Sequence, residues 1–161
     1  MPSSSRSRIE VAVGRRAPAF SVATTAGTFR LRDRPAGSLV LYFYPRDMTP
    51  GCTTEGGDFR DLAPDFRRAG ATILGVSTDS LESHRRFREK LGLPFELASD
   101  PEHALGAQFG VWQRKNLYGK RSMGIVRSTF LIDARGVLRR EWRKVRVAGH
   151  ADDVLAAARE L

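Results

Sequence analysis

The sequence predicts an α/β fold built on a mixed central sheet. Residues 39–44 and 72–77 are short apolar runs typical of buried strands, and a segment with helical spacing of apolar residues separates them. This short return through a helix favours a parallel, right-handed crossover. Residues 128–133 form another apolar run, and a turn and a further strand-like stretch follow it, which predicts an antiparallel hairpin. Parallel and antiparallel pairs therefore share one sheet.

The first predicted helix follows the loop at residues 46–51. Its apolar positions recur at helical spacing and close near Gly70; they are Phe59, Leu62, Ala63 and Phe66. Pro64 lies inside this pattern, so we expect it to kink the helix or to end its first part.

Two start signals predict the next helices. Asp79, with Glu82 three residues later, resembles a capping box. The helix it opens would turn three apolar side chains inward, namely Leu81, Phe87 and Leu91. Asp100 followed by Pro101 repeats the signal for a short helix. Its apolar side would consist of Ala104, Leu105 and Phe109.

The remaining elements complete the predicted order. Residues 134–136 form the turn of the late hairpin, whose second strand covers residues 137–145, and residues 152–161 have the pattern of a closing helix. An N-terminal hairpin is expected around Phe20 and Phe29. A thioredoxin-like three-layer α/β/α sandwich has this order. The pattern also allows a flavodoxin-like sheet, but the late hairpin favours the thioredoxin-like alternative.

Length and composition indicate one globular domain. The chain has 161 residues, with 41% hydrophobic and 28% charged residues. Residues 1–8 are rich in Ser and Arg, so we interpret them as a flexible basic tail, and residues 9–161 as the single domain. The sequence has no run of 18 apolar residues and no apolar core of a signal peptide near its start. We therefore expect a cytoplasmic protein without membrane association.

The charge balance raises the question of nucleic-acid binding. Lys and Arg total 27 against 18 Asp and Glu, which gives a formal charge of +9. The arginines are scattered along the chain, however, and no nucleic-acid-reading motif accompanies them. We interpret them as a solvated surface and expect no nucleic-acid partner.

Cysteine and histidine usage limits the kinds of site. A single cysteine excludes an intrachain disulfide and every cysteine-rich metal site. His84, His103 and His150 lack the spacing of metal ligands, so we interpret them as surface or hydrogen-bonded histidines. The sequence predicts no metal and no bound cofactor.

The surroundings of Cys52 indicate a reactive thiol. A lone cysteine is more often a small core residue. Here, however, polar and turn-forming residues flank it, and it stands between a buried strand with its loop and the mouth of a helix. Unpaired N–H groups and the dipole at a helix N-terminus favour the thiolate, which is the reactive form.

The stretch LYFYPRDMTPGCTTEGGDFRDL, residues 41–62, resembles the active-site region of the peroxiredoxins. The similarity is to the peroxiredoxin Q or bacterioferritin comigratory protein subfamily. Pro45, Thr49 and Cys52 meet the family pattern. A second stretch, RSTFLID at residues 127–133, is also similar to sequences of this subfamily. The resemblance extends from Gly14 to the C-terminal helix.

This resemblance implies a thiol-dependent peroxidase that acts on hydrogen peroxide and small organic hydroperoxides without a cofactor. By family correspondence Cys52 attacks the peroxide, Thr49 presents its hydroxyl to it, and Pro45 shields the thiolate from water. Arg127 brings the positive charge that holds thiolate and transition state.

Two further residues have supporting roles in this interpretation. Backbone N–H groups near Gly51 and Cys52 complete the donor set. Glu55 is a candidate partner for Arg127, because a carboxylate in the first helical turn could orient a guanidinium. An ordinary first-turn charge is the alternative for Glu55.

The sequence departs from many subfamily members in having no resolving cysteine. One usual position holds Gly57, and the other falls near residues 87–89, again without cysteine. We therefore expect a one-cysteine cycle, in which an external thiol resolves the sulfenic acid. Thioredoxin, glutaredoxin with glutathione, and small thiols are the candidate partners. The subfamily favours a monomer, with a homodimer as the alternative.

Three points remain open: an alternative function, the role of two glycines near Cys52, and the role of a polar segment. Without a resolving cysteine, the protein could instead be a peroxide-responsive redox sensor or a thiol-regulated interaction protein. Gly56 and Gly57 would weaken the helix start, and we hypothesise that its local opening exposes oxidised Cys52 to the reductant. The polar segment WQRKNLYGK, residues 112–120, either borders the site or a partner surface, or packs structurally.

Overall fold

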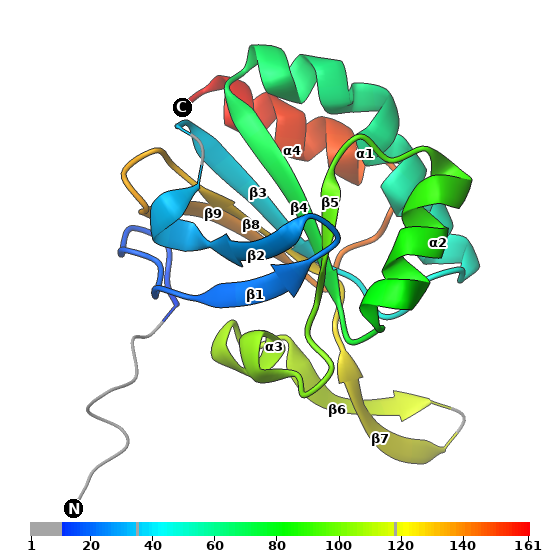
Figure 1. Ribbon diagram of the computed structural model, residues 1–161. Coiled ribbons are helices and arrows are strands. Elements are labelled where there is room, and N and C mark those ends of the chain that lie inside the picture. The colour runs from blue at the N-terminus through cyan, green and yellow to red at the C-terminus, as the bar shows by residue number, and fades with distance from the viewer. Residues whose placement is uncertain (1–10, 35, 118) are drawn as a thin grey trace, which may run out of the picture.

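A mixed sheet of seven strands organises the described part of the chain (Figure 1). The computed structural model describes residues 11–34, 36–117 and 119–161. The strand order is β2-β1-β5-β4-β3-β8-β9. The strands are β1 (Ser21–Thr24), β2 (Gly27–Arg30), β3 (Ser38–Phe43), β4 (Ala71–Ser77), β5 (Glu96–Ser99), β8 (Ser128–Ile132) and β9 (Leu138–Arg143). A short 3-10 helix, η2 (Leu31–Asp33), follows β2.

Helices cover both faces of this sheet. They are α1 (Pro50–Arg68), α2 (Leu81–Leu91), α3 (Ala104–Gln108) and α4 (His150–Arg159). In Figure 1, α1 and α4 lie above the sheet and the short α3 lies below it. The thioredoxin-like three-layer α/β/α prediction is confirmed.

The strand pairing confirms the predicted parallel unit and both hairpins. β3 pairs parallel with β4, and β4 pairs parallel with β5. On the other side of β3, β8 pairs antiparallel, and β9 pairs antiparallel with β8. The β1–β2 hairpin joins the opposite edge. An antiparallel strand directly beside the central β3 is incompatible with the parallel sheet of a flavodoxin-like fold.

The central strand β3 separates two apolar cores. Its side chains alternate between the faces of the sheet, as the pleat requires. Tyr42 stacks on Phe59 of α1 at a ring-centroid distance of 4.6 Å, and this core also receives α2 and α4. Phe43 points to the other core, where Phe109 and Phe130 form an edge-to-face pair at 5.0 Å. Because β3 is buried on both faces, packing holds the end of this strand, and the loop that follows begins from a fixed position.

α1 runs through Pro64, so this proline does not end the helix, and a kink at Pro64 stays a prediction. Two helix start signals were wrong in detail. Ser80, not Asp79, caps α2, because the Ser80 hydroxyl accepts from the Ser83 N–H. α3 begins three residues after Pro101, although the Asp100 carboxylate still accepts from backbone N–H groups in its first turn.

A two-stranded arm, which the sequence analysis did not predict, projects from the fold. It consists of β6 (Trp112–Leu117) and β7 (Lys120–Ile125), which pair antiparallel with each other and with no strand of the main sheet. Figure 1 shows this arm extending away from the sheet on the side of α3. The Val126 N–H donates to the Val111 carbonyl at 2.8 Å and closes the base of the arm. The arm therefore leads directly into Arg127.

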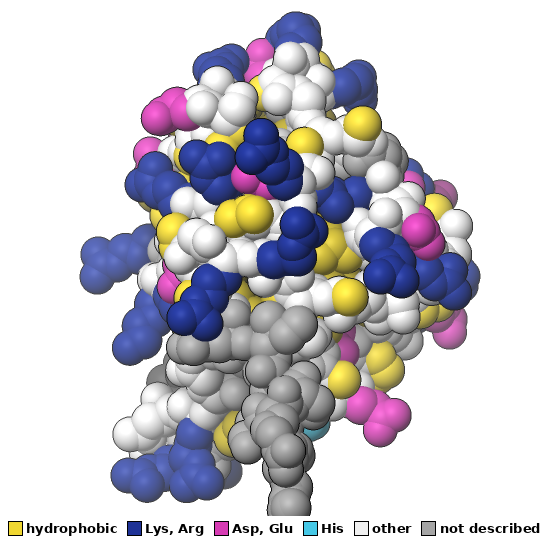
Figure 2. All heavy atoms as spheres, turned by 90° about the vertical axis from the view of Figure 1, so that its left-hand side faces the viewer, with side chains coloured by type: hydrophobic (Ala, Val, Ile, Leu, Met, Phe, Trp, Pro, Cys, Tyr) yellow, Lys and Arg dark blue, Asp and Glu magenta, His cyan; other side chains and the backbone are white. Residues whose placement is uncertain are grey.

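Basic side chains are dispersed over the surface. Figure 2 shows Lys and Arg spread over one face, with Asp and Glu between some of them. Several arginines form surface ion pairs, such as Arg88 with Glu96 at 3.0 Å and Arg143 with Glu141 at 3.0 Å. This arrangement supports the interpretation of a solvated basic surface. Among the described residues, no helix combines the length and the apolar character needed to cross a membrane.

The predicted tail, residues 1–8, lies outside the described residues. The assignment of residues 9–161 to one domain stays a prediction.

Candidate active site

The loop after β3 delivers Cys52 to the first turn of α1. Thr49 has extended backbone at the N-cap position and Pro50 is the first helical residue, where its missing N–H costs no hydrogen bond. The Thr53 N–H donates to the Thr49 carbonyl at 2.9 Å, so the helix is formed from its start. Cys52 is 2% exposed. Its sulfur therefore lies at the positive end of the helix but away from bulk water.

Arg127 reaches Cys52 from the loop between β7 and β8. Its Nη2 donates to the Cys52 sulfur at 3.4 Å, and its Nη1 donates to Glu55 Oε1 at 2.5 Å. A Cβ at position 51 would lie 3.1 Å from Arg127 Nη2, so glycine at that position leaves room for the guanidinium. The predicted pairing of Glu55 with Arg127 is therefore present in the structure, beside the sulfur.

Burial shifts the protonation equilibria of this ion pair. Loss of water raises the pKa of Glu55 to about 7, because the nearby Arg127 offsets only part of that effect. Burial also acts against the Arg127 charge, but Glu55 and Cys52 outweigh it and raise the pKa of Arg127. Burial has the larger effect on the pKa of Glu55, because Glu55 is 1% exposed and Arg127 is 15% exposed. Arg127 is therefore the permanent charge of the pair, and Glu55 is the group that titrates near neutral pH.

The other predicted site residues lie in the loop that precedes α1. The Thr49 hydroxyl donates to the Arg46 carbonyl at 2.9 Å, which leaves its oxygen lone pairs free to accept. Pro45 and Thr49 are both half-buried. Glu55 was expected in the first turn of the helix, but it lies in the second, because α1 begins at Pro50. The predicted residues thus come from the loop before α1, the first two turns of α1 and the loop that leads into β8.

A buried polar network, which the sequence analysis missed, fastens the active-site loop. The Asp47 carboxylate accepts from the Tyr44 hydroxyl at 2.7 Å and from the Ser83 hydroxyl at 2.8 Å. The same carboxylate lies 2.7 Å from Nδ1 of His84, whose Nε2 lies 2.9 Å from the Ala98 carbonyl. The loop is thereby joined to α2 and to β5. Asp47 was overlooked because its neighbours look like an ordinary polar loop.

The backbone of this loop is anchored as well. The Asp47 N–H donates to Asp79 Oδ2 at 2.8 Å, and the Ser77 hydroxyl donates to the same oxygen. The next residue, Met48, has φ of +67°, a left-handed conformation that is unfavourable for a residue with a side chain. The network supplies the restraint that holds this conformation. Asp79, predicted as a helix cap, is therefore an anchor of the active-site loop.

The same network has the composition of a metal site. Asp47, Asp79 and His84 offer ligand atoms that lie within 4.8 Å of one another. Protein donors already occupy the carboxylate oxygens Asp47 Oδ1, Asp47 Oδ2 and Asp79 Oδ2. The contacts therefore describe a structural network.

The three histidines occupy three different environments. His84 is buried in the polar network. His150 is buried beside the Thr129 hydroxyl at 2.8 Å, and burial lowers the pKa of His150 to about 4. His103 is half-exposed and stacks on Trp112 with ring centroids 3.9 Å apart.

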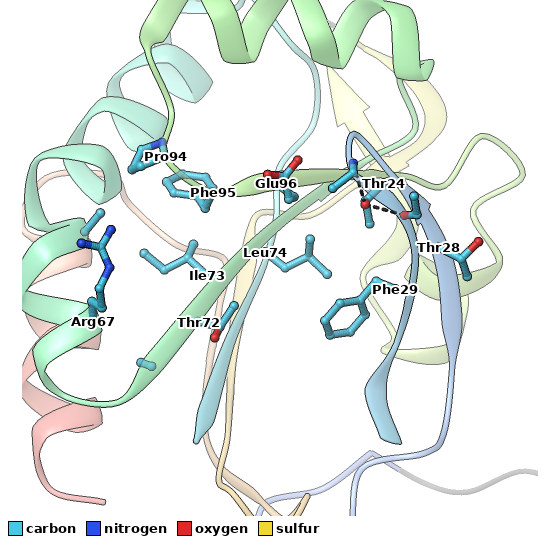
Figure 3. Close-up of a pocket in the computed structure, with 14 residues that line it drawn as sticks. Thr24, Thr28, Phe29, Arg67, Thr72, Ile73, Leu74, Pro94, Phe95 and Glu96 are labelled. Atoms are coloured by element: carbon cyan, nitrogen blue, oxygen red, sulfur yellow. Dashed lines mark hydrogen bonds between the residues drawn. The ribbon is translucent and has the colours of Figure 1, made fainter. Parts of the chain in front are cut away.

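A separate cavity of about 390 Å³ lies away from Cys52 (Figure 3). Ile73 and Leu74 of β4 line it together with Phe29 of the β1–β2 hairpin, and Arg67 of α1 lies at one side. None of the predicted site residues is among its lining residues. This cavity is therefore distinct from the thiol site.

Comparison with known proteins connects this geometry to a family. The AhpC/TSA family model matches residues 13–141. Peroxiredoxin Bcp of Bacillus subtilis is 48% identical over 152 residues, which cover 94% of this chain and 97% of that protein. The chain belongs to the AhpC/TSA family. A second relative, peroxiredoxin Bcp of Xanthomonas campestris, is 57% identical over 127 residues, 79% of each protein.

Solved structures agree with this assignment. Peroxiredoxin Q of Xanthomonas campestris matches with a TM-score of 0.83 and 51% identity, over 88% of this chain and 90% of that one. Peroxidoxin BcpB of Mycobacterium tuberculosis matches with a TM-score of 0.83 and 35% identity, over 94% and 99%. The protein is a peroxiredoxin, a thiol-dependent peroxidase.

The titration of Glu55 predicts a pH dependence of cysteine oxidation. Above pH 7 the ionised carboxylate orients Arg127 through a charge-assisted hydrogen bond, and below pH 7 this bond weakens. We expect Glu55→Gln to lower the rate constant for oxidation by hydrogen peroxide roughly tenfold at pH 8. Between pH 6 and 8 the variant should also lack the wild-type fall in rate near pH 7. Stopped-flow oxidation across this range measures both effects.

The free energy of unfolding should fall as the pH rises, whereas the oxidation rate constant should rise. Because the folded-state pKa of Glu55 is raised, its ionisation removes stability as the pH rises from about 4.5 through 7. The wild type should therefore lose more unfolding free energy than Glu55→Gln over that interval, as measured by urea unfolding. Superimposable pH profiles of the two proteins in both experiments would show that Glu55 does not titrate there.

Proposed function

We propose that this peroxiredoxin works by a one-cysteine cycle centred on Cys52. The thiolate sulfur attacks one oxygen of the hydroperoxide, the O–O bond breaks, and the leaving alkoxide or hydroxide takes up a proton. The products are the Cys52 sulfenic acid and an alcohol or water. The observation that carries this proposal is the position of the sequence's one cysteine at a helix N-terminus, 3.4 Å from a nitrogen of the partly buried Arg127 guanidinium.

Arg127 supports the chemical step in this proposal. Its charge stabilises the thiolate before attack and the developing anion afterwards, in a site from which water is largely excluded. Glu55 fixes the guanidinium from its other side, through the bond at 2.5 Å. Gly51 permits the approach, since a side chain there would meet Arg127. Arg127 thus has the geometry of a preorganised cation.

Thr49 and Pro45 complete the proposed pocket. The Thr49 hydroxyl, whose proton is directed to the Arg46 carbonyl, is available as an acceptor for the peroxide proton. Pro45 follows Tyr44 at the end of the buried strand segment, and in this proposal it shields the thiolate from water. The substrates proposed are hydrogen peroxide and small organic hydroperoxides. A solved structure of the Xanthomonas campestris bacterioferritin comigratory protein concerns its alkyl peroxide reduction activity, which supports this substrate class.

The second half of the cycle requires an external thiol, because the chain has no further cysteine. A reductant thiolate attacks the sulfenic sulfur, an S–S bond forms, and hydroxide leaves and is protonated to water. A second thiolate then attacks the reductant sulfur of this mixed disulfide and releases Cys52 as thiolate. Thioredoxin, glutaredoxin with glutathione, and small thiols all fit this chemistry. A reducing compartment suits such a cycle, and we propose a cytoplasmic monomer.

A sensor function is the second candidate. The observation that favours it is the absence of a resolving cysteine, since a sulfenic acid without a matching reductant would persist. Repeated turnover with a thiol distinguishes the enzyme from a sensor that oxidises once.

Peroxide consumption under turnover conditions tests the proposed cycle. With excess thiol, the wild type should consume many equivalents of hydrogen peroxide, and Cys52→Ser should consume none above background. Arg127→Ala should lower the oxidation rate constant by about 10² to 10³, because it removes a charged donor at the reacting sulfur. Arg85→Ala, an exposed arginine on α2, is the control and should match the wild type. A single equivalent consumed by the wild type would favour the sensor instead.

The structure separates the roles of the two glycines near Cys52. A Cβ at Gly56 would lie 3.3 Å from Leu91 Cδ1, so Gly56 serves close packing between α1 and α2. A Cβ at Gly57 would meet nothing closer than the Arg60 side chain at 3.5 Å. Gly57 is therefore the position at which helix propensity can be changed without crowding.

Gly57→Ala should stabilise the start of α1 by roughly 1 kcal/mol and so reduce its local opening. If reduction of the sulfenic acid requires that opening, the variant should be reduced several-fold more slowly by the same thiol, with unchanged oxidation by peroxide. Asp61→Ala, at an exposed position later in α1, is the control for helix propensity. Equal reduction rates in Gly57→Ala and wild type would contradict the opening hypothesis.

A further inference from the structure

The cavity that is separate from the thiol site lies in a gap of the central sheet. β4 pairs with β3 from Ala71 onward, but its pairing with β5 begins only at Leu74. Within the described part of the chain, residues 71–73 therefore have a neighbouring strand on one side only. Figure 3 shows β4 and the β1–β2 hairpin diverging on the other side, with Leu74 and Phe29 pointing into the space between them. This gap contains the cavity of about 390 Å³.

The two ends of this cavity differ in chemical character. Arg67, in the last turn of α1, lies at one end, and Phe29 lies at the other. The buried side chains of Ile73 and Leu74 lie between these ends. Most of the lining residues are apolar. A ligand that matches this arrangement has a charged head and an apolar body.

Arg67 forms no ion pair with any residue that the structure describes. The carboxylate of Asp65, two residues earlier, is bound instead by Arg68 at 2.5 Å. The positions one helical turn before Arg67 hold Ala63 and Pro64, which carry no charge. Because Arg67 is also exposed, its guanidinium is available to an anion that enters the cavity.

Glu96 is the acidic residue that lines the cavity, and both of its carboxylate oxygens are already engaged. Oε1 accepts from the Thr25 hydroxyl at 2.5 Å, and Oε2 accepts from Arg88 at 3.0 Å. Arg88 therefore balances the charge of Glu96, whereas the charge of Arg67 is left unbalanced. The cavity consequently favours a negatively charged ligand over a cation.

We propose that this cavity binds a small carboxylate of the fatty-acid type, with its head on Arg67 and its alkyl chain along Ile73 and Leu74. The volume of about 390 Å³ falls in the range of roughly 300–1,000 Å³ that is usual for small-molecule sites. Arginine can donate two parallel hydrogen bonds to a carboxylate, which fixes the orientation of the head. Burial of the alkyl chain supplies most of the affinity, because an exposed ion pair contributes little.

This binding site is separate from the peroxide chemistry. Cys52 and Arg127 do not line the cavity, and Arg67 lies at the opposite end of α1 from Cys52. The proposal therefore holds or fails independently of the one-cysteine cycle.

Calorimetric titration of the reduced, full-length protein tests the proposal with three probes. They are octanoate, hexanoate and octylammonium, each used below the concentration at which it aggregates. Octanoate should bind saturably at one site per chain. Hexanoate should bind roughly tenfold more weakly, because it buries two fewer methylene groups. Octylammonium has the same chain with the opposite charge and should bind roughly tenfold more weakly as well. Octanoate should shift the backbone amide NMR signals mainly at residues 27–29 and 71–74.

Variants locate the bound carboxylate. Arg67→Gln should weaken octanoate binding roughly fivefold, and Arg67→Lys should weaken it less. Arg68→Gln changes the net charge equally at the next exposed position, outside the cavity, and should bind octanoate like the wild type. Arg127→Ala should also bind like the wild type, because it removes the cation beside Cys52 and not the one at the cavity. Ala71→Leu, at a half-buried lining position, should weaken binding by filling part of the space.

Three outcomes would overturn the proposal. The first is a wild type that shows no saturable binding of octanoate, which needs no variant to fold. The second is an equal loss in Arg67→Gln and Arg68→Gln, which would assign the binding to net charge. The third is a loss in Arg127→Ala with unchanged binding in Arg67→Gln, which would place the carboxylate at the thiol site. Peroxide consumption is measured separately, so failure of the proposed function is distinguishable from each of these.

Discussion

The contact of one guanidinium with a thiol and a carboxylate organises the active site of this peroxiredoxin. Arg127 comes from the loop before β8, whereas Cys52 comes from the first turn of α1 and Glu55 from the second. The two elements are brought together because β8 pairs directly with β3, and β3 leads into the loop before α1. The antiparallel pairing of β3 with β8 is therefore the feature of the fold on which the chemistry depends.

The second constraint is the polar network beneath the active-site loop. Asp47 connects this loop to His84 of α2 and, through its backbone, to Asp79. Together these contacts hold Met48 in a left-handed conformation and fix the approach to α1. The site thus combines an ion pair beside the Cys52 sulfur with a buried network that positions the loop. Both use buried polar groups, whose hydrogen bonds restrict the geometry more strongly than apolar packing does.

Much of this arrangement could be predicted from the sequence. The buried β3 and β4 strands, the helix between them and the late hairpin have strong apolar patterns, and the resemblance supplied Cys52, Thr49, Pro45 and Arg127. The β6–β7 arm was missed because it packs little apolar surface, so its strands show weak alternation. Asp79 was misassigned because a capping residue and a loop anchor look alike until the partner from residue 47 is known. Long-range polar contacts of this kind leave no periodic signal in a sequence.

A double-mutant cycle on Glu55 and Arg127 tests the central role of their contact most directly. The quantity to measure is the rate constant for oxidation of Cys52 by hydrogen peroxide in wild type, Glu55→Gln, Arg127→Ala and the double variant. If Glu55 acts by positioning Arg127, the double variant will be no slower than Arg127→Ala alone. Independent, multiplying losses in the double variant would contradict the account and give Glu55 a role separate from the guanidinium.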